Sequence, residues 1–470
     1  MAVIPQIFRL LWGSLLILPL IYLYWPRDGA HLLHTRPWRR ASGSIANGTA
    51  GFSKILVINR PARTDRRDAM TLAAAVSNLT LDWVDGVDGD TVEERVLPPG
   101  DRPKSKSSDT AVRGSWRAHM NALRRVVEEG LPSALIMEDD ADWDLRIKSQ
   151  LQTFGAASSL WLWTTRDMVS QSSDSWSTTD DHPIVYQSRI RRVVASREAN
   201  TNLTDRQAVE RDSILLDQQS TASTSSSDHP YGEDWDVIWL GHCGTAFPEE
   251  GNTSLPLLRV VIGDDPTVPA PRHLKPHPFA FHDAIGQLYP PHTRVVHAAA
   301  SPTTACTLAY AVSQRGARKL LWQFGLEDFA SQWDLMLGNW CSGGYVDRSD
   351  KVESEDGKQD GDDEAGGTGT EVRDATRDEE KARRGRWEKS KRRQRQRQQP
   401  TCLTVQPPIF GHYFAKKGAS DIRGQGGGYV SKVGTPYVRW SVRMNLDVLA
   451  EGGTASDVVD QLPDEGEAMW

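Results

Sequence analysis

The strongest pattern in the chain is a run of apolar residues that leads directly into a cluster of acids. The run is Ala134–Met137, and Glu138, Asp139, Asp140 and Asp142 follow it. An apolar run of this length predicts a buried strand, most often a parallel one. Open α/β sheets bind ligands at the C-terminal ends of such strands. Neighbouring carboxylates repel one another unless a positive group lies among them, and a divalent cation is the usual one. The alternative is a strand followed by a solvated acidic turn.

Upstream of this stretch, the pattern predicts a β-α-β unit. Lys54–Ile58 is rich in β-branched residues, which is typical of a buried strand. A basic loop, Asn59–Arg67, leads into a helix with Thr64 or Asp65 as its N-cap. Trp83–Gly89 predicts a second short strand that ends in glycine turns. This order implies parallel strands and a right-handed connection. Guanidinium groups beside a helix N-terminus favour a phosphate site, although a solvated basic turn is the alternative.

A helix is predicted over Val112–Gly130, because apolar residues recur there at helical spacing. Ser115 is the expected N-cap, and His119 lies in the first turns. A single histidine on a helix is more often a packed or surface residue than a catalyst.

Further strands are predicted at Asp234–Gly241, Arg294–His297 and Thr307–Ser313. Helices are expected from Gln314 onward and around Asp334. Strands that alternate with helices predict an α/β fold.

Two stretches lack apolar periodicity and predict insertions into the domain at about 165–230 and 347–400. The second ends in a basic run, Arg392–Arg397, which we interpret as a solvated loop and not as a nucleic-acid site. The folded domain is therefore expected over 53–446. The tail, 447–470, is expected to be disordered after Glu451.

The N-terminal residues 1–26 contain an apolar segment, Leu10–Trp25, which predicts a single-pass membrane anchor. A cleaved signal peptide is the alternative, but no small-residue cleavage site follows the segment. Residues 27–52 are polar and predict a stem. The topology has conflicting signals. Arginines after the span favour a cytosolic body by the positive-inside rule, whereas four glycosylation sequons favour a lumenal one: Asn47, Asn78, Asn202 and Asn252. We expect a type II protein of the secretory pathway, in the Golgi or the ER.

Composition changes this picture in two ways. Hydrophobic residues make up 38% of the 470 residues, which is low for a fully packed chain and agrees with the predicted insertions. The chain has four cysteines without a CxxC pair, which excludes a zinc ribbon or a thioredoxin motif. In an oxidising compartment they can form two disulfides, with three possible pairings.

The order of these motifs resembles that of glycosyltransferase family 25, which includes lipooligosaccharide and collagen galactosyltransferases. The segments that carry the resemblance are Lys54–Asn59 with Arg63 and Arg66, Trp83–Gly89, Gly114–Trp116 with His119, Ala134–Asp140, Asp236–Gly241, Ala309–Ser313 with Gly316 and Ala317, Asp334, Pro408, and Ser420–Ile422. His119 follows Ala118, where the family has a Ser-His pair.

The resemblance implies a glycosyltransferase A fold, an α/β/α sandwich around a mostly parallel sheet. It implies transfer of a hexose, with galactose as the expected sugar, from a UDP-sugar to a glycan or glycoprotein acceptor. Mn²⁺ or Mg²⁺ would stabilise the leaving diphosphate. The implied metal ligands are Asp140 first, then Glu138, Asp142 and His412. The implied donor-binding residues are Asn59, Arg60, Arg63, Arg66, Asp88, Gly89, Ser115, His119 and Asp139.

The family is similar to inverting transferases, and inversion needs a carboxylate that deprotonates the acceptor hydroxyl. Asp334 and Asp236 are the candidates for this base. Two other functions stay open. One is a catalytically inactive relative that works as a binding or scaffold protein. The other is a cytosolic interaction protein that uses its basic tract.

Overall fold

The computed structural model of the chain describes residues 44–98, 109–171, 191–192, 212–216, 229–248, 255–275, 285–299, 304–345, 399–415, 432–454 and 456–469. The expected anchor, residues 27–43 of the expected stem, most of both insertions and the Ser420–Ile422 segment lie outside these residues. Within the described ranges, no helix has the length and apolar character needed to cross a membrane.

The predicted β-α-β unit forms one edge region of the sheet. Strand β1 (Lys54–Asn59) pairs in parallel with β2 (Leu81–Asp85) and with β3 (Ser133–Glu138), which confirms the parallel arrangement. Helix α2 (Thr64–Val76) connects β1 to β2. The predicted cap of α2 is wrong, because its N-cap is Arg63 and no side chain caps it.

The centre of the sheet is mixed. Strand β10 (Ala309–Ser313) runs antiparallel to both β3 and β7 (Val237–Gly241). It begins at Ala309, opposite Met137 near the end of β3, and ends at Ser313, opposite Ser133. Strand β11 (Cys402–Gln406) is parallel to β7. The order across the sheet is β2-β1-β3-β10-β7-β11-β9-β8-β6-β5.

The far edge of the sheet includes part of the predicted first insertion. Strand β9 (Arg294–Ala298) is antiparallel to β11 and to β8 (Arg259–Ile262). Strand β6 (Ser213–Leu216) then pairs in parallel with β8, and β5 (Arg191–Arg192) pairs with β6. Since β5 and β6 fall within 165–230, this stretch contributes strands to the sheet.

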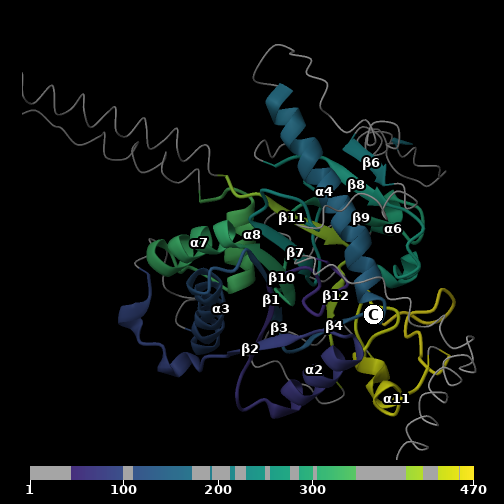
Figure 1. The fold of residues 1–470 in the computed structure, drawn as a ribbon, viewed down its shortest axis with the longest axis horizontal. Coiled ribbons are helices and arrows are strands. Elements are labelled where there is room, and N and C mark those ends of the chain that lie inside the picture. The colour runs from purple at the N-terminus through teal and green to yellow at the C-terminus, as the bar shows by residue number, and fades with distance from the viewer. Residues whose placement is uncertain are drawn as a thin grey trace, which may run out of the picture. The chain divides into compact units, whose positions relative to one another are not determined.

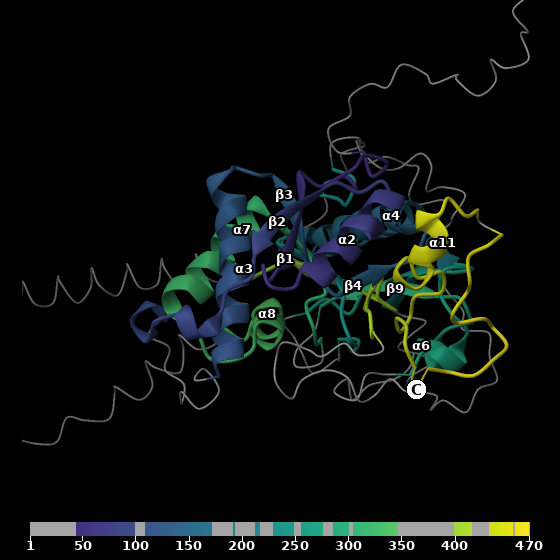
Figure 2. The ribbon, with the colours of Figure 1, turned by 90° about the horizontal axis from the view of Figure 1, so that it is seen from below.

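Helices cover both faces of the sheet, so the domain has three layers (Figures 1 and 2). Helices α3 (Thr110–Glu128), α7 (Gln314–Trp322) and α8 (Trp333–Cys341) lie on one face. Helices α2, α4 (Ile147–Gln171) and α11 (Leu446–Ala450) lie on the other. Alternate residues of β1, β3, β7 and β11 enter the two cores, as the two-residue period of a strand requires. The observed fold is therefore α/β, as the sequence predicts.

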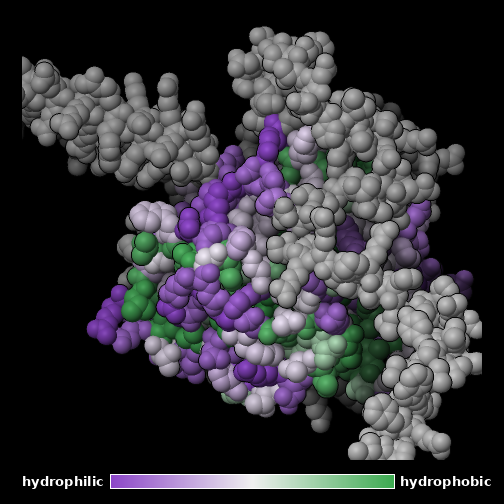
Figure 3. Space-filling view, in the orientation of Figure 1, coloured by the Kyte–Doolittle hydropathy of each residue, from purple (hydrophilic) through white to green (hydrophobic). Residues whose placement is uncertain are grey.

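The remaining short elements lie in the connections. They are helix α6 (Ile285–Leu288), the 3₁₀ turns Gly89–Thr91, Glu94–Val96, Pro271–His273 and Arg443–Asn445, the π turn Gln323–Glu327, and strands β4 (Ala141–Trp143) and β12 (Phe410–His412). Strand β12 pairs with β4 and touches β7 at one position, so it joins the acidic stretch to the C-terminal part of the chain. Figure 3 shows apolar side chains at the surface around α7.

The described C-terminal residues pack onto the domain, which corrects the expected disordered tail. Leu462 and Met469 are buried. Arg439 donates to Asp460 at 2.6 Å, and the Gln461 side chain donates to two backbone carbonyls. The apolar and ionic contacts of these residues hold the segment against the fold.

All four cysteines form disulfides, and the structure selects one of the three possible pairings. Cys243 bonds to Cys306, and Cys341 bonds to Cys402. The Cα atoms lie 5.5 Å apart in both pairs, which is within the usual range for a disulfide.

Candidate functional site

The acidic stretch lies at the edge of the sheet where β1 and β3 end. Asn59 is the last residue of β1 and Glu138 is the last residue of β3. Asp139 and Asp140 form the turn that follows, and Asp142 lies in β4. Parallel strands end at the same edge, so the fold brings together polar side chains that are far apart in the sequence.

Positive groups lie among these acids, as the repulsion between carboxylates requires. The Nη1 atom of Arg66 lies 2.7 Å from Asp139 Oδ1 and 2.8 Å from Asp140 Oδ2. Asn59 Nδ2 donates to Asp139 Oδ2 at 2.8 Å, and Arg443 Nη2 donates to the backbone carbonyl of Asp139 at 2.7 Å. The guanidinium groups of Arg66 and Arg443 therefore supply much of the positive charge that the sequence predicts among these acids.

Asp140 has one carboxylate oxygen that no group of the described residues contacts with a hydrogen bond. His412 Nε2 lies 3.4 Å from Asp140 Oδ2. Burial opposes ionisation, but His412, Arg66 and Arg443 together hold the pKa of Asp140 well below its ordinary value. The other oxygen, Asp140 Oδ1, is buried without a hydrogen-bond partner, and so is His412 Nδ1. Carboxylate oxygen and imidazole nitrogen are both ligand types that Mn²⁺ accepts, so these atoms fit the expected ion in kind.

Asp142 is engaged elsewhere and does not share this role. Its side chain is fully buried. One carboxylate oxygen accepts from the backbone amides of Trp143 and Arg443, and the other accepts from the hydroxyls of Thr435 and Ser441. With both oxygens bonded in this way, Asp142 fixes the C-terminal segment to β4.

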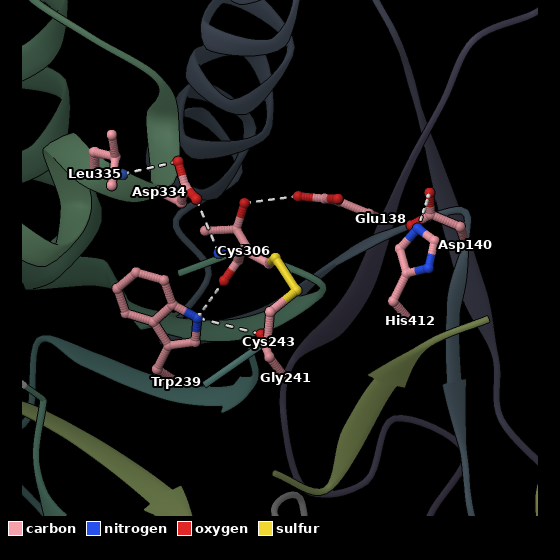
Figure 4. The surroundings of a disulfide bond; sticks show 10 residues. Glu138, Asp140, Trp239, Gly241, Cys243, Cys306, Asp334, Leu335 and His412 are labelled. Carbon is pink, nitrogen blue, oxygen red and sulfur yellow. Dashed lines mark hydrogen bonds and ion pairs between the residues drawn. A yellow bond between two sulfur atoms is a disulfide. The ribbon is translucent and has the colours of Figure 1, made fainter. Parts of the chain in front are cut away.

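Glu138 faces Asp334 across the loop that carries the first disulfide (Figure 4). Thr307 Oγ1 donates to Glu138 Oε1 at 2.6 Å. Asp334, in the first turn of α8, accepts from the backbone amides of Cys306 at 2.8 Å and Leu335 at 2.9 Å. Burial, followed by the nearby Asp140, raises the pKa of Glu138 to about 8, although a third of its side chain is exposed (33%). Burial also raises the pKa of Asp334.

His119 lies behind Glu138 and not at the surface of the site. Its side chain stacks on Trp333, with ring centroids 5.1 Å apart, and its Nδ1 lies 3.1 Å from Tyr310 Oη. His119 Nε2 is 3.8 Å from Glu138 Oε1. Burial lowers the pKa of His119 to about 3, so the ring is neutral. His119 therefore supports Glu138 from the core.

Ser115 is half-buried in α3, and the predicted N-cap role is wrong. The N-cap is Asp109, whose carboxylate accepts from the amide of Ala111 at 2.9 Å. The helix starts earlier than its apolar pattern indicates, because Thr110 and Ala111 are helical without belonging to the apolar face.

The other expected donor-binding residues lie around the start of α2 and α3. Arg63 forms two hydrogen bonds with Asp65, at 2.8 and 2.9 Å. Arg60 pairs with the exposed Asp88 at 3.7 Å. Gly89 is buried against α3, where an added Cβ would come 1.5 Å from the carbonyl oxygen of Thr110, so this glycine serves close packing.

Asp236 directly precedes β7, at the opposite ends of the strands from the acidic stretch. Its backbone carbonyl accepts from the amide of Ser313, which pairs with Ser133 at the start of β3. The length of β3, about 16 Å at 3.3 Å per residue, lies between this level and Glu138. Asp236 is fully buried and bonds to Arg315 at 2.7 Å and Lys319 at 2.8 Å. The two proposed catalytic acids are thus not in one site, and only Asp334 lies near the acidic stretch.

Sequence patterns missed Arg443 and Thr307. Arg443 is 7% exposed and bonds to Asp139, which lies 304 residues earlier. Thr307 lies at the start of a predicted strand, and no local pattern connects it to Glu138. In the sequence, Arg443 is one of many basic residues, and nothing nearby indicates that it contacts the acidic stretch.

No known protein-family model matches the chain. Among the described residues, no group of three or more His, Cys, Asp and Glu side chains is arranged to hold a metal ion.

Proposed function

We propose that the protein is a glycosyltransferase that moves a hexose, galactose in the first instance, from a UDP-sugar to a glycan or glycoprotein acceptor with inversion. The observation that carries the proposal is the buried, unpaired Oδ1 of Asp140 at the C-terminal edge of the sheet, next to the Arg66 guanidinium. An acid with a free oxygen beside a fixed cation is suited to a diphosphate with its divalent ion. The glycosyltransferase A assignment of the fold is part of this proposal, and it is supported by the α/β/α layers.

In this proposal Asp140 and His412 would hold Mn²⁺ or Mg²⁺, with Glu138 beside them. A bound ion would supply Lewis-acid stabilisation of the charge on a leaving diphosphate. Arg66 is placed to bind phosphate oxygens, and Asp139 orients Arg66 through its 2.7 Å hydrogen bond. Arg443 holds the Asp139–Asp140 turn in place through the backbone.

Asp334 is the proposed base for the acceptor hydroxyl. Each of its oxygens accepts one backbone amide, which orients the carboxylate and leaves further lone pairs for a hydroxyl proton. Burial raises its pKa, which strengthens it as a proton acceptor when it is ionised.

The two disulfides support a location in an oxidising compartment, because such bonds persist there and are rare in the cytosol. We therefore propose the lumen of the secretory pathway, with the N-terminal segment as a membrane anchor. Endoglycosidase treatment of the protein from cells tests this placement. A loss of mass is expected, and an unchanged mass would contradict a lumenal body.

The test of activity is nucleotide release from UDP-galactose with Mn²⁺ by the purified protein. The Asp140→Asn variant should lose at least about a hundredfold in turnover, since electrostatic groups of this kind contribute two to three orders of magnitude. Asp264→Asn is the matched control, because Asp264 is exposed and has φ +51°, a conformation that Asn also adopts. Equal turnover in the Asp140→Asn variant would overturn the assignment.

A second candidate is a sugar-nucleotide-binding protein without turnover. It is favoured by the two guanidinium groups that already balance the acids. Binding of UDP-galactose without nucleotide release, in the presence of Mn²⁺ and a panel of acceptors, would support this second function.

A further inference from the structure

A second cluster of polar side chains lies on the far side of the sheet, and the proposed transferase does not use it. Arg259 on β8 and His297 on β9 are directly opposite each other in the antiparallel pair, so their side chains share one face. Ser213 on β6 is the neighbour of Arg259 on its other side. All three side chains are buried, with 8%, 0% and 1% exposed for Arg259, His297 and Ser213. We call these residues, together with Phe247 and Tyr289, the Arg259 cluster.

The buried guanidinium of Arg259 has no acid partner among the residues that the structure describes. Its Nη1 lies 3.4 Å from Tyr289 Oη, and its guanidinium lies 4.2 Å above the Phe247 ring. The Nε atom is buried and has no hydrogen-bond partner. In the described part of the chain no carboxylate pairs with this guanidinium. Arg294, also buried, shows the usual arrangement, because it pairs with Asp265 at 2.9 Å and donates to two carbonyls. A buried charge is costly unless a counter-charge compensates it.

The two hydroxyl groups of the cluster can also donate, whereas the free nitrogen of His297 is an acceptor until the ring takes up a proton. His297 Nδ1 lies 2.8 Å from the backbone carbonyl of Ala298, so Nδ1 carries the hydrogen, and the buried Nε2 has no partner. The hydroxyls of Ser213 and Tyr289 are 3.0 Å apart. Burial, and then Arg259 and His242, lower the pKa of His297 to about 3.

We propose that the Arg259 cluster is an oxyanion-binding site, which takes a phosphate, sulfate or carboxylate group on the guanidinium of Arg259, with Tyr289 and Ser213 as hydroxyl donors. An oxyanion supplies the counter-charge that the buried guanidinium lacks and matches its planar donor geometry. His297 borders the site and can take up a proton when the anion enters.

The site is separate from the acidic stretch. Strand β8 is five strand spacings from β3 in the sheet order, about 24 Å at 4.8 Å per spacing. Anion binding here is therefore independent of the proposed glycosyltransfer, and it can be tested without measuring activity. The oxyanion can be a free inorganic ion or an acidic group on a saccharide, and the two sources share the chemistry of recognition.

Isothermal titration of the full-length protein at constant ionic strength tests the site, with inorganic phosphate, sulfate, galactose 6-sulfate and neutral galactose as probes. We expect wild-type protein to bind at least one oxyanion probe, and the Arg259→Gln variant to bind it at least tenfold more weakly. Arg124→Gln is the control, because the Arg124 side chain is exposed (57%) on α3, and its affinity should match wild type. Binding of galactose 6-sulfate but not of the inorganic ions assigns the site to a saccharide-borne group.

The proposal is overturned if wild-type protein binds none of the oxyanion probes at millimolar concentration, or if Arg259→Gln binds as tightly as Arg124→Gln. Loss of neutral galactose binding in Arg259→Gln, with sulfate binding unchanged, would also overturn it. If Arg259→Gln fails to fold, the Tyr289→Phe variant tests the site instead. This variant keeps the aromatic ring of residue 289 against Phe247 and removes only the hydroxyl group. A severalfold weaker affinity is expected for Tyr289→Phe, and wild-type affinity would contradict the site.

Discussion

The backbone amide of Cys306 donates a hydrogen bond to the carboxylate of Asp334 at 2.8 Å, and Cys306 is covalently bonded to Cys243. The next residue, Thr307, donates to Glu138. One disulfide-bonded loop therefore orients two acids that come from different elements, β3 and α8 (Figure 4). This arrangement connects the covalent structure of the protein to the geometry of its candidate site.

Removal of the Cys243–Cys306 bond should reduce turnover more than its effect on stability explains. In the Cys243→Ser/Cys306→Ser variant, the loop is free to move and both acids lose a fixed partner. We expect at least a tenfold loss of nucleotide release at a temperature where the protein remains folded. Turnover and thermal unfolding, measured on the same samples, test this prediction.

The second disulfide provides the matched control. Cys341 and Cys402 are 61 residues apart and Cys243 and Cys306 are 63 apart, so both bonds restrict the unfolded chain to a similar degree. In the chain-entropy description, each contributes about 4 kcal/mol. The Cys341→Ser/Cys402→Ser variant should lose similar stability and keep its turnover. Equal loss of turnover in both variants would show that the first disulfide has no special role.

Asp142→Asn should destabilise the fold without changing metal dependence. The amide group cannot accept hydrogen bonds at both oxygen positions, so two donors among Thr435, Ser441 and the nearby amides lose their acceptor. We expect a loss of roughly 3 kcal/mol in the free energy of unfolding. Urea unfolding measures it, with Asp264→Asn as the control. An unchanged unfolding midpoint together with a weaker apparent Mn²⁺ affinity would instead make Asp142 a metal ligand.

Acid should destabilise the protein partly through His119. Burial lowers the folded-state pKa of His119 to about 3, whereas an unfolded histidine has a pKa near 6.5. The unfolded chain therefore binds a proton that the folded chain excludes, and stability is lost as the pH falls from about 6.5 towards 3. At pH 5 the contribution is roughly 2 kcal/mol.

The measurement compares wild type with His119→Gln by urea unfolding at pH 7.5 and pH 5. The variant should lose less stability between the two values than wild type, because it lacks the titrating ring. An identical pH dependence would mean that the folded protein admits the proton on His119, against its burial.

Gly89→Ala should disrupt the start of α3. The new methyl group would meet the backbone carbonyl of Thr110 at 1.5 Å, and backbone cannot move aside as a flexible side chain can. We expect a loss of several kcal/mol or failure to fold, by the cost of overpacking. Gly325→Ala is the control, because its nearest contact, Met120 Sδ, lies at 3.9 Å. Thermal unfolding followed by circular dichroism compares the two variants. A wild-type unfolding midpoint for Gly89→Ala would contradict the close packing.

Much of the architecture was predictable from local patterns. The strands predicted at Lys54–Ile58 and in Trp83–Gly89 form parallel neighbours, as their order with an intervening helix implied. The acids after Met137 lie at the strand end, where ligands bind in such sheets. These features depend on residues that are close in the sequence, because the spacing of apolar residues predicts which segments form strands and helices.

Tertiary structure alone decided the roles of the acids. Asp142 is saturated by Thr435 and Ser441, which lie 293 and 299 residues later, whereas Asp140 keeps a buried oxygen unpaired. Asp236 and Asp334 were both candidates for the catalytic base from the sequence. In the fold, Asp334 lies near Glu138 at the end of β3, whereas Asp236 lies near the level where β3 begins. The physical reason is that the charge and the hydrogen bonds of a carboxylate depend on the groups around it. These groups belong to segments that are distant in the sequence, and no local pattern connects them to the carboxylate.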